Sequence, residues 1–363
     1  MKGRGKAFVL AGGGTGGHLV PGLVLAEVLS RDWGIAPILV TGKRPVEDRV
    51  LAGAPWERLA LDLEGPPFRV LLRLPGALAR TAALFRSRPV GGVLILGGRI
   101  GIPAAFLARA AGIPLFLLEV NALPGKTTRF LAPFARRIFL GYARTAPFFH
   151  PGRVRIRGIP VRPSFFSLPD REEARRDLAL PSGGGPVLLV VGGSMGARSL
   201  NEALPRLLAG RLPAGTRVVH IAGADMEEEV RRAWRSGGIR ARVFPFLRAV
   251  DTAFAAADLA ICRGGALTMG EVAAARLPAL VVPYPWHKDR HQEANAAPLA
   301  EEGGVLVLPQ EELEHRVARE VAGLLGDRER LERMRAALGR VSLAAPGEPL
   351  AEELVVEGRL RRR

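Results

Sequence analysis

Two glycine-rich turns that lie far apart in the sequence constrain the fold of this chain more than any other feature. The first, at residues 12–18, reads Gly-Gly-Gly-Thr-Gly-Gly-His and follows an apolar run at 7–10. The second, at 192–197, reads Gly-Gly-Ser-Met-Gly-Ala and follows an apolar run at 187–191. A buried strand that leads through a glycine turn into a helix points backbone N–H groups and the positive helix end at a ligand. Two such units predict two nucleotide-type domains that face a central cleft, an arrangement suited to moving a group from a phosphorylated donor to a second substrate.

Buried-strand patterns alternate with helix patterns on both sides of a proline-rich linker at 160–169. The strands expected in the first half are 7–11, 37–40, 93–96, 115–118, 137–140 and 154–157, with helices at 21–31, 103–111 and 126–134. Those expected in the second half are 187–191, 218–222, 242–244, 259–262, 279–282 and 305–308, with helices at 200–208, 226–234, 266–275, 292–302 and 311–325. Continuous apolar strands followed by helices are typical of a parallel sheet covered on both faces. The expected fold class is α/β, with two doubly wound, Rossmann-like domains that bind ligands at the carboxyl ends of their strands.

The net charge of +17 is unevenly divided along the chain. Residues 1–163 contain 24 Lys and Arg against 8 Asp and Glu, whereas residues 164–363 contain 28 against 27. This division predicts that only the first half meets an anionic partner. A nucleic-acid-binding protein would use such a half too, but Tyr142 and Tyr284 are the only tyrosines and aromatic residues make up 6%. Because no stacking platform is evident, we expect no nucleic-acid partner.

The remaining bulk features fit a protein of about two domains. The single cysteine, Cys262, excludes an internal disulfide and is typical of a reducing compartment. No apolar run approaches the roughly 20 residues that a membrane-spanning helix requires. We therefore expect a protein that is soluble or peripheral to a membrane.

The first glycine turn leaves two functions open. Gly12, Gly14 and Gly17 fit the G-x-G-x-x-G pattern, which also marks dinucleotide-binding dehydrogenases. Such an enzyme needs an acidic residue after its second strand to hold the NAD ribose, but this chain has Lys43 and Arg44 there. An NADP-dependent oxidoreductase therefore remains an alternative. His18 closes the turn at the start of a helix, where a neutral imidazole could accept a proton.

The second half contains three segments suited to a nucleotide sugar. Ser194 and Gly196 could wrap a diphosphate with a hydroxyl and backbone N–H groups. A third glycine element at 262–271 ends in Glu271, whose carboxylate could take both hydroxyls of a ribose, and the polar run 286–295 could read sugar hydroxyls. Neither an H-E-x-x-H motif nor an Asp-x-Asp pair is present, so no metal site is expected. Helix N-termini and Arg162 would then stabilise the departing diphosphate.

Residues 68–88 mix apolar residues with arginines, as an interfacial segment on anionic lipid does. The residues expected at a membrane surface are Phe68, Leu72, Leu74, Leu78, Phe85, Arg73 and Arg80. The alternative is a core-packed helix whose arginines extend to solvent.

The motifs also occur in a recognisable order along nearly the whole chain. They are Gly13–His18, Pro160–Arg162, Gly192–Ser194 with Gly196–Arg198, Gly265–Thr268 with Glu271, and His287–Arg290 with Gln292 and Asn295. Together they closely resemble the MurG family, whose members are GT-B-fold, inverting, metal-independent N-acetylglucosaminyltransferases. The resemblance implies transfer of GlcNAc from UDP-GlcNAc to the 4-hydroxyl of MurNAc in undecaprenyl-linked lipid I, which forms lipid II in peptidoglycan synthesis. It also implies that no cofactor is needed and that the protein is peripheral at the cytoplasmic face of the inner membrane.

The resemblance further implies a division of labour. Residues 1–163, joined by a C-terminal helix within 346–363, would form the domain that binds lipid I and faces the membrane, and residues 164–345 would bind UDP-GlcNAc. His18 would be the catalytic base, with Glu119 as a second candidate for acid–base work or for orienting the acceptor. The residues expected around the donor are Thr15, Gly16, Gly17, Asn121, Arg162, Ser194, Gly196, Phe246, Leu247, Ala266, Leu267, Thr268, Glu271, His291, Gln292 and Asn295. The chain departs from the family pattern at Arg99, Leu118, Val120, Ile159 and His291, mostly in the acceptor half.

One more alternative shares the expected donor site. Another GT-B enzyme that uses a UDP-sugar, such as a glycolipid glycosyltransferase or a UDP-GlcNAc 2-epimerase, would need the same nucleotide contacts. The presence or absence of UDP release with and without lipid I separates these activities.

Overall fold

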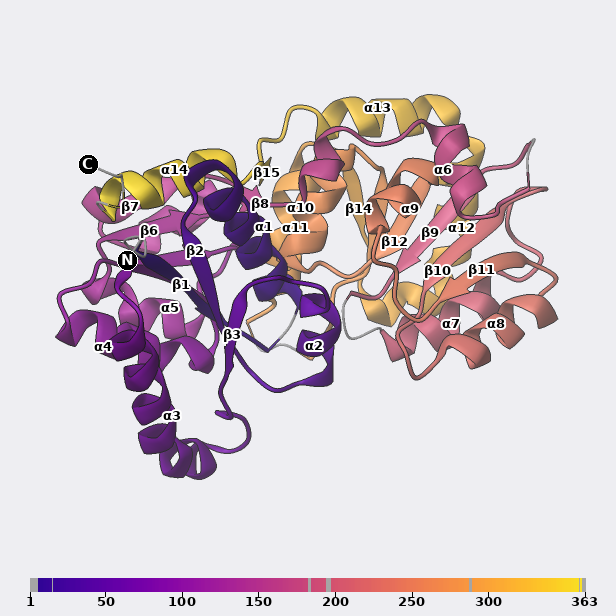
Figure 1. Cartoon of the computed structure of the whole chain (residues 1–363). Coiled ribbons are helices and arrows are strands. Elements are labelled where there is room, and N and C mark those ends of the chain that lie inside the picture. Colours follow the sequence, from indigo (N-terminus) through magenta and orange to yellow (C-terminus); the bar gives the residue numbers. More distant parts are fainter. Residues whose placement is uncertain are drawn as a thin grey trace. The chain divides into compact units, whose positions relative to one another are not determined.

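The computed structural model describes residues 6–14, 16–181, 184–193, 197–286, 289–358 and 360. The chain divides into two compact units. Unit 1 contains the residues up to Arg162 and those from Ala345 onward, and unit 2 runs from Pro163 to Ala344. Each unit is built on one parallel sheet with helices against it (Figure 1).

Unit 1 contains a seven-stranded parallel sheet. In spatial order its strands are β3 (Glu57–Ala60), β2 (Ala36–Thr41), β1 (Ala7–Gly12), β4 (Val90–Gly97), β5 (Leu115–Glu119), β6 (Arg137–Leu140) and β7 (Val154–Ile156). Its helices are α1 (Gly16–Trp33), α2 (Pro45–Leu51), α3 (Pro67–Ser87), α4 (Ile102–Ala110), α5 (Lys126–Leu131) and α14 (Glu348–Glu357). Every residue of the interior strand β1 is buried, and Val9 lies in register with Ile38 on one side and Val93 on the other. Burial on both faces explains why β1 is continuously apolar.

Unit 2 repeats this plan with six parallel strands. Their order is β11 (Arg240–Phe244), β10 (Arg217–Ile221), β9 (Val187–Val191), β12 (Leu259–Cys262), β13 (Ala279–Val281) and β14 (Val305–Val307). Its helices are α6 (Arg171–Asp177), α7 (Arg198–Leu208), α8 (Glu227–Ser236), α9 (Val250–Ala256), α10 (Ala266–Ala275), α11 (His291–Glu301), α12 (Leu313–Gly326) and α13 (Arg328–Leu338). One face of the sheet packs Leu188, Val190 and Ile261 against apolar residues of α7, α8 and α12.

The C-terminal helix α14 belongs to unit 1, although it follows unit 2 in the sequence (Figure 1). Glu353 pairs with Arg155 (3.1 Å) and Arg157 (2.7 Å) of the β7 segment. Glu357 pairs with Arg136 and Arg137, both at 2.6 Å. Two glutamates of one helix therefore bind four arginines around β6 and β7, and burial of Leu350, Ala351, Leu354 and Val355 completes the contact.

The predicted strands are confirmed in both units, while several helices and one strand differ from expectation. The first helix was expected to begin at Pro21, which is wrong, because α1 begins at Gly16 and contains Pro21. A proline in the second turn removes one N–H donor, so the Gly17 carbonyl oxygen loses its usual i→i−4 partner, yet the helix continues through this position. The elements absent from the sequence prediction, β3, α2, α6, α9 and α13, are short or highly charged. No helix among the described residues is both long and apolar enough to cross a bilayer.

A buried polar network joins β10 to α7 and α8 in unit 2. His220 is fully buried, and its Nδ1 accepts a hydrogen bond from Trp234 Nε1 (3.0 Å). Its Nε2 therefore carries the proton and donates to Asn201 Oδ1 (3.0 Å). Asn201 Nδ2 in turn donates to the carbonyl oxygen of Ala222 (2.7 Å). Burial lowers the pKa of His220 from 6.5 to about 3, so the folded protein keeps this imidazole neutral.

The neutral His220 predicts an acid-sensitive unit 2. In the unfolded chain the imidazole binds a proton below its ordinary pKa, whereas in the folded chain it does so only near pH 3. Its contribution to stability is therefore complete above about pH 6.5 and is lost as the pH falls toward 3, by roughly 1.4 kcal/mol per pH unit. Urea unfolding followed by Trp fluorescence should show a shallower acid decline in His220→Gln than in the parent chain. Equal slopes would contradict the assignment.

Candidate functional site

The donor residues predicted in unit 2 lie at one edge of its sheet. Gly192 and Gly193 follow β9, and Gly264 and Gly265 follow the neighbouring strand β12. The residue pair 246–247 follows β11, and α11 begins at His291 beyond β13. Because all these strands are parallel, their carboxyl ends meet at the same edge, where doubly wound sheets bind ligands.

Arg263 links several segments at this edge through hydrogen bonds. Its Nη1 donates to the carbonyl oxygens of Val282 (2.9 Å) and Pro283 (3.1 Å). Its Nη2 donates to Ser199 Oγ (2.6 Å) and Gln310 Oε1 (2.7 Å). Burial lowers the pKa of this guanidinium to about 10, and it contacts no carboxylate among the residues that the structure describes. Arg263 thus places a buried positive charge directly before the Gly264–Gly265 turn, a role that the sequence did not reveal.

Two predicted sugar-contacting residues of α11 bind backbone groups at this edge. Asn295, which is fully buried, donates from Nδ2 to the carbonyl oxygen of Gly264 (3.1 Å). Gln292 accepts the N–H of Tyr284 on Oε1 (2.9 Å), which ties α11 to the loop after β13. Gly264 fits because it has no side chain, since a Cβ there would lie 2.2 Å from the Gln292 carbonyl oxygen.

The other predicted donor residues differ in how far their side chains are exposed. Glu271 lies in the second turn of α10 and is 7% exposed, so it is not the solvated helix acid that a random glutamate would be. Ala266 is buried, whereas Leu267, Thr268, Phe246 and Leu247 are half-buried. His291 is half-buried, and its Nδ1 lies 2.9 Å from Asp289 Oδ1, a contact that lowers the pKa of Asp289.

Some predictions fall outside the described residues. These are Thr15 of the first turn, Ser194 and Gly196 of the second, and His287 and Lys288 of the polar run. Their roles stay predictions from the sequence.

His18 lies in the first turn of α1 in unit 1, close to the ends of β1 and β4. It is half-buried, and its Nδ1 lies 3.3 Å from the carbonyl oxygen of Gly13. The last residue of β4, Gly97, must be glycine. A Cβ there would lie 3.1 Å from His18 Nε2, and its φ is +114°. Gly16 is buried and Gly17 is half-buried beside it.

Glu119 is the last residue of β5, which lies next to β4. Both of its carboxylate oxygens accept hydrogen bonds from the loop that follows. Its Oε1 accepts from the backbone N–H and the Nδ2 of Asn121, both at 3.0 Å. Its Oε2 accepts from the N–H of Gly125 (2.9 Å) and from Thr128 Oγ1 (2.6 Å). These four bonds favour a role in ordering the 121–128 loop over a role in accepting a proton. Arg162 is half-buried at the end of unit 1, where its side chain has no ion pair with a described residue.

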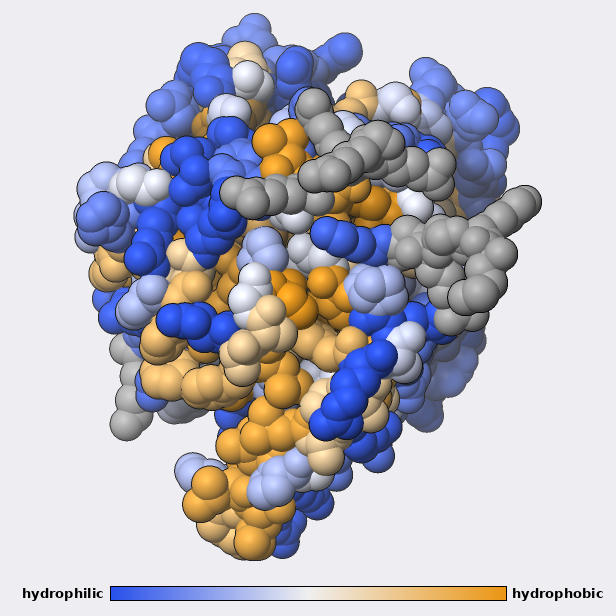
Figure 2. All heavy atoms as spheres, turned by 60° about the vertical axis from the view of Figure 1, so that its left-hand side comes forward, coloured by the Kyte–Doolittle hydropathy of each residue, from blue (hydrophilic) through white to orange (hydrophobic). Residues whose placement is uncertain are grey.

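The α3 helix divides into a packed part and an exposed tip. Ala77, Thr81 and Leu84 form its buried stripe. Near its start, Phe68 is 61% exposed, Leu71 is 70% exposed and Leu72 is 77% exposed. Figure 2 shows this apolar tip projecting from the surface. Among the other residues predicted for a membrane surface, Leu74, Leu78 and Phe85 are half-buried, Arg80 is exposed, and Arg73 pairs with Asp62 (2.5 Å).

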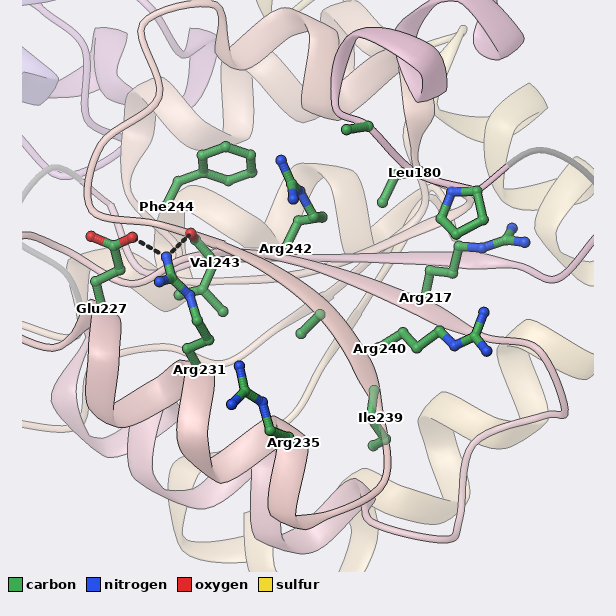
Figure 3. A pocket seen from close by; sticks show the side chains of 13 residues that line it. Leu180, Arg217, Glu227, Arg231, Arg235, Ile239, Arg240, Arg242, Val243 and Phe244 are labelled. Carbon is green, nitrogen blue, oxygen red and sulfur yellow. Dashed lines mark hydrogen bonds and ion pairs between the residues drawn. The ribbon is translucent and has the colours of Figure 1, made fainter.

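A separate hollow of about 750 Å³ lies along the edge strand β11 (Figure 3). The residues that line it include Arg217, Arg231, Arg235, Arg240 and Arg242. Arg231 is paired with Glu227 and Glu228, whereas Arg235, Arg240 and Arg242 form no ion pair within the described parts of the chain. None of the predicted donor residues lines this hollow. In the described ranges, no three His, Cys, Asp or Glu side chains gather as metal ligands would.

Comparison with known proteins assigns the family. The N-terminal domain of glycosyltransferase family 28 matches residues 8–140, and the C-terminal domain of the same family matches residues 187–346. A protein from Halorhodospira halophila is named UDP-N-acetylglucosamine–N-acetylmuramyl-(pentapeptide) pyrophosphoryl-undecaprenol N-acetylglucosamine transferase. It is 38% identical to this chain, over 91% of this chain and 92% of its own length. The chain belongs to the MurG family.

Other matches agree with this family. A protein of the same name from Methylococcus capsulatus is 36% identical over 97% of this chain and 99% of its own. The crystal structure of MurG from Acinetobacter baumannii superposes with a TM-score of 0.74 at 26% identity, covering 96% of this chain and 99% of that one. A UDP-N-acetylglucosamine 2-epimerase superposes with a TM-score of 0.68 at 15% identity, a likeness of fold alone. The expected fold class of two Rossmann-like parallel-sheet domains is confirmed by the sheets and these neighbours, and the oxidoreductase alternative is not favoured.

The packing at Gly264 predicts a sharp difference between two adjacent glycines. A Gly264→Ala change forces a Cβ against the Gln292 carbonyl oxygen, whereas a Cβ on Gly265 would meet only Thr268 Oγ1, at 3.8 Å. Gly264→Ala should lose about 1–3 kcal/mol of unfolding free energy. Gly265→Ala should keep the parent Tm in thermal unfolding of the full chain. Equal Tm values for both variants would show that the α11 contact does not have the described geometry.

Proposed function

We propose that this protein transfers GlcNAc from UDP-GlcNAc to the 4-hydroxyl of MurNAc in lipid I, forming lipid II for peptidoglycan synthesis. The observation that carries the proposal is the 38% identity to the Halorhodospira halophila protein, which is named for this transfer, over 92% of that protein's length. The donor residues gathered at the carboxyl edge of the unit 2 sheet supply suitable chemistry.

In the proposed donor complex, unit 2 binds the uridine diphosphate. Glu271 takes the ribose hydroxyls, while Phe246 and Leu247 lie against the uracil. The helix that begins at Ala266 directs its N-terminal N–H groups at the diphosphate, together with Ser194 and Gly196. The buried charge of Arg263 supports this arrangement, because an anion beside the turn would offset a guanidinium that has no carboxylate partner in the described chain.

The proposed reaction is a single displacement. The acceptor hydroxyl oxygen attacks the anomeric carbon of GlcNAc from the face opposite UDP, and the bond from that carbon to the diphosphate oxygen breaks. His18 accepts the hydroxyl proton. Arg162 and the helix N-termini stabilise the negative charge that develops on the leaving UDP. The contacts of Glu119 support a role in ordering the loop that contains Asn121.

We further propose that no divalent ion takes part, since backbone amides and cations would neutralise the diphosphate. The lipid-linked acceptor places the reaction at a membrane, and we propose peripheral binding to the anionic cytoplasmic face through α3. The exposed Phe68, Leu71 and Leu72 support this surface. The excess of basic over acidic residues in 1–163 supports it too.

The proposed roles predict opposite defects for two variants. His18→Ala should lose turnover by a factor of about 10²–10⁴, the usual contribution of a positioned base, while it keeps UDP-GlcNAc affinity. Glu271→Ala should instead lose UDP affinity in calorimetry. Turnover is measured as lipid II formation from lipid I and labelled UDP-GlcNAc in the presence of EDTA. Release of UDP in the absence of lipid I would instead indicate an epimerase. Near-parental turnover in His18→Ala would refute its role.

The α3 tip predicts a lipid-binding defect that leaves the fold intact. Each large apolar side chain that enters the bilayer contributes about 1.5–3 kcal/mol, so Phe68→Ser with Leu72→Ser should weaken binding to anionic vesicles by a factor of about 10²–10⁴. Ile156→Ser, which changes a 48% exposed side chain elsewhere in unit 1, is the matched control. Vesicle co-sedimentation measures both, and equal binding by the double variant and the control would exclude the tip.

A further inference from the structure

A buried carboxylate lies beneath the first glycine turn. Glu47, in the first turn of α2, is fully buried, and its Oε1 accepts the N–H of Gly14 at 2.5 Å. Among the residues that the structure describes, its Oε2 has no hydrogen-bond partner, and its one ion-pair contact is with Arg58, with Nη2 at 4.0 Å. A buried carboxylate costs several kcal/mol unless it is well compensated. A carboxyl group retained here with such incomplete pairing suggests a role beyond packing.

The peptide group that Glu47 holds is also the one that contacts His18. The Gly13 carbonyl and the Gly14 N–H belong to a single peptide unit. The carbonyl oxygen of Gly13 lies 3.3 Å from His18 Nδ1. A carbonyl oxygen can only accept, so Nδ1 carries a proton, and in the neutral ring Nε2 is then the nitrogen with the free lone pair. Glu47 and His18 thus bind opposite ends of one planar, polarisable group.

We propose that Glu47 is a positioning residue that acts on His18 through the Gly13–Gly14 peptide. The carboxylate polarises the peptide by accepting its N–H, which makes the carbonyl a stronger acceptor for His18 Nδ1–H. The ring is then held in the tautomer whose Nε2 can accept a proton. This inference rests on the proposed function for the role of His18 as base, but the link from Glu47 to His18 is a property of unit 1 alone.

Two residues packed against the Glu47 carboxylate must be glycines, because side chains there would clash with it. A Cβ on Gly13 would lie 2.6 Å from Glu47 Oε1, and one on Gly42 would lie 2.7 Å from Oε2. Gly14 has a φ of +101°, which favours glycine.

Charged groups hold the rest of the turn. Arg44 Nη1 donates to the Gly14 carbonyl oxygen (3.0 Å) and pairs through Nε with Glu64. Arg58 donates to the carbonyl oxygen of Gly42 (2.9 Å) and to Asp48 Oδ1 (2.6 Å). Arg44 therefore holds the turn through the peptide unit that follows Gly14, independently of Glu47, so removing the charge of Glu47 need not collapse the turn.

The test compares Glu47→Gln with Asp48→Asn in the full chain. Gln keeps the size and an acceptor oxygen but removes the charge, and Asp48→Asn removes an adjacent carboxylate that also binds Arg58 but not the turn. The ¹⁵N spectrum of the histidine rings, assigned with His18→Gln, reports the His18 tautomer. We expect Glu47→Gln to shift His18 away from the Nδ1–H form and Asp48→Asn to leave it unchanged. Unchanged His18 resonances in Glu47→Gln would overturn the proposal, whatever its Tm.

The kinetic arm separates positioning from a merely structural role. Glu47→Gln should lower kcat roughly 10- to 100-fold, part of what a positioned base contributes, with KM for UDP-GlcNAc within about twofold of the parent value. In a His18→Ala background the same change should have no further effect, since Glu47 acts through His18. An equal loss of kcat in both backgrounds would overturn the proposal. If the parent chain lacks transferase activity, the proposed function fails, while the tautomer measurement still decides the link.

Discussion

A parallel sheet with helices on both faces leaves only the ends of its strands for polar chemistry, and both units depend on this constraint. In unit 1, His18 follows β1, Gly97 ends β4 and Glu119 ends β5, three neighbouring strands. In unit 2, the turns after β9 and β12 lie side by side in the same way. The apolar strands thus determine where reactive groups can lie. The glycines determine how closely the neighbouring backbone approaches those groups.

The two edges differ in the charged groups that lie next to their glycine turns. Unit 2 contains Arg263, a buried cation whose described contacts are all neutral, which suits an anionic diphosphate. Unit 1 instead contains two buried carboxylates: Glu47 accepts the N–H of Gly14 in the turn that precedes His18, and Glu119 accepts N–H groups of the loop that follows β5. One edge is therefore suited to hold a leaving group and the other to orient a proton acceptor, as a group transfer between two substrates requires.

The sequence allowed the strands of both sheets to be predicted because burial on both faces leaves a continuous apolar pattern, as in β1 and β9. Half-exposed β3 has no such pattern and was not predicted. Glu47 and Arg263 were missed as organising residues because their partners are remote in sequence. Glu47 binds a glycine 33 positions away, and Arg263 binds Ser199 from 64 positions away. In sequence, Glu47 beside Asp48 and Arg263 before Gly264 look like ordinary surface residues.

The most direct test of the account is hydrogen exchange of the full chain with and without UDP-GlcNAc, in the presence of EDTA. The account predicts slower exchange at residues 264–271 and 291–295, where main-chain amides and α11 would hold the donor. Protection confined to the arginine-lined hollow at 231–244, or protection that requires a divalent ion, would contradict it.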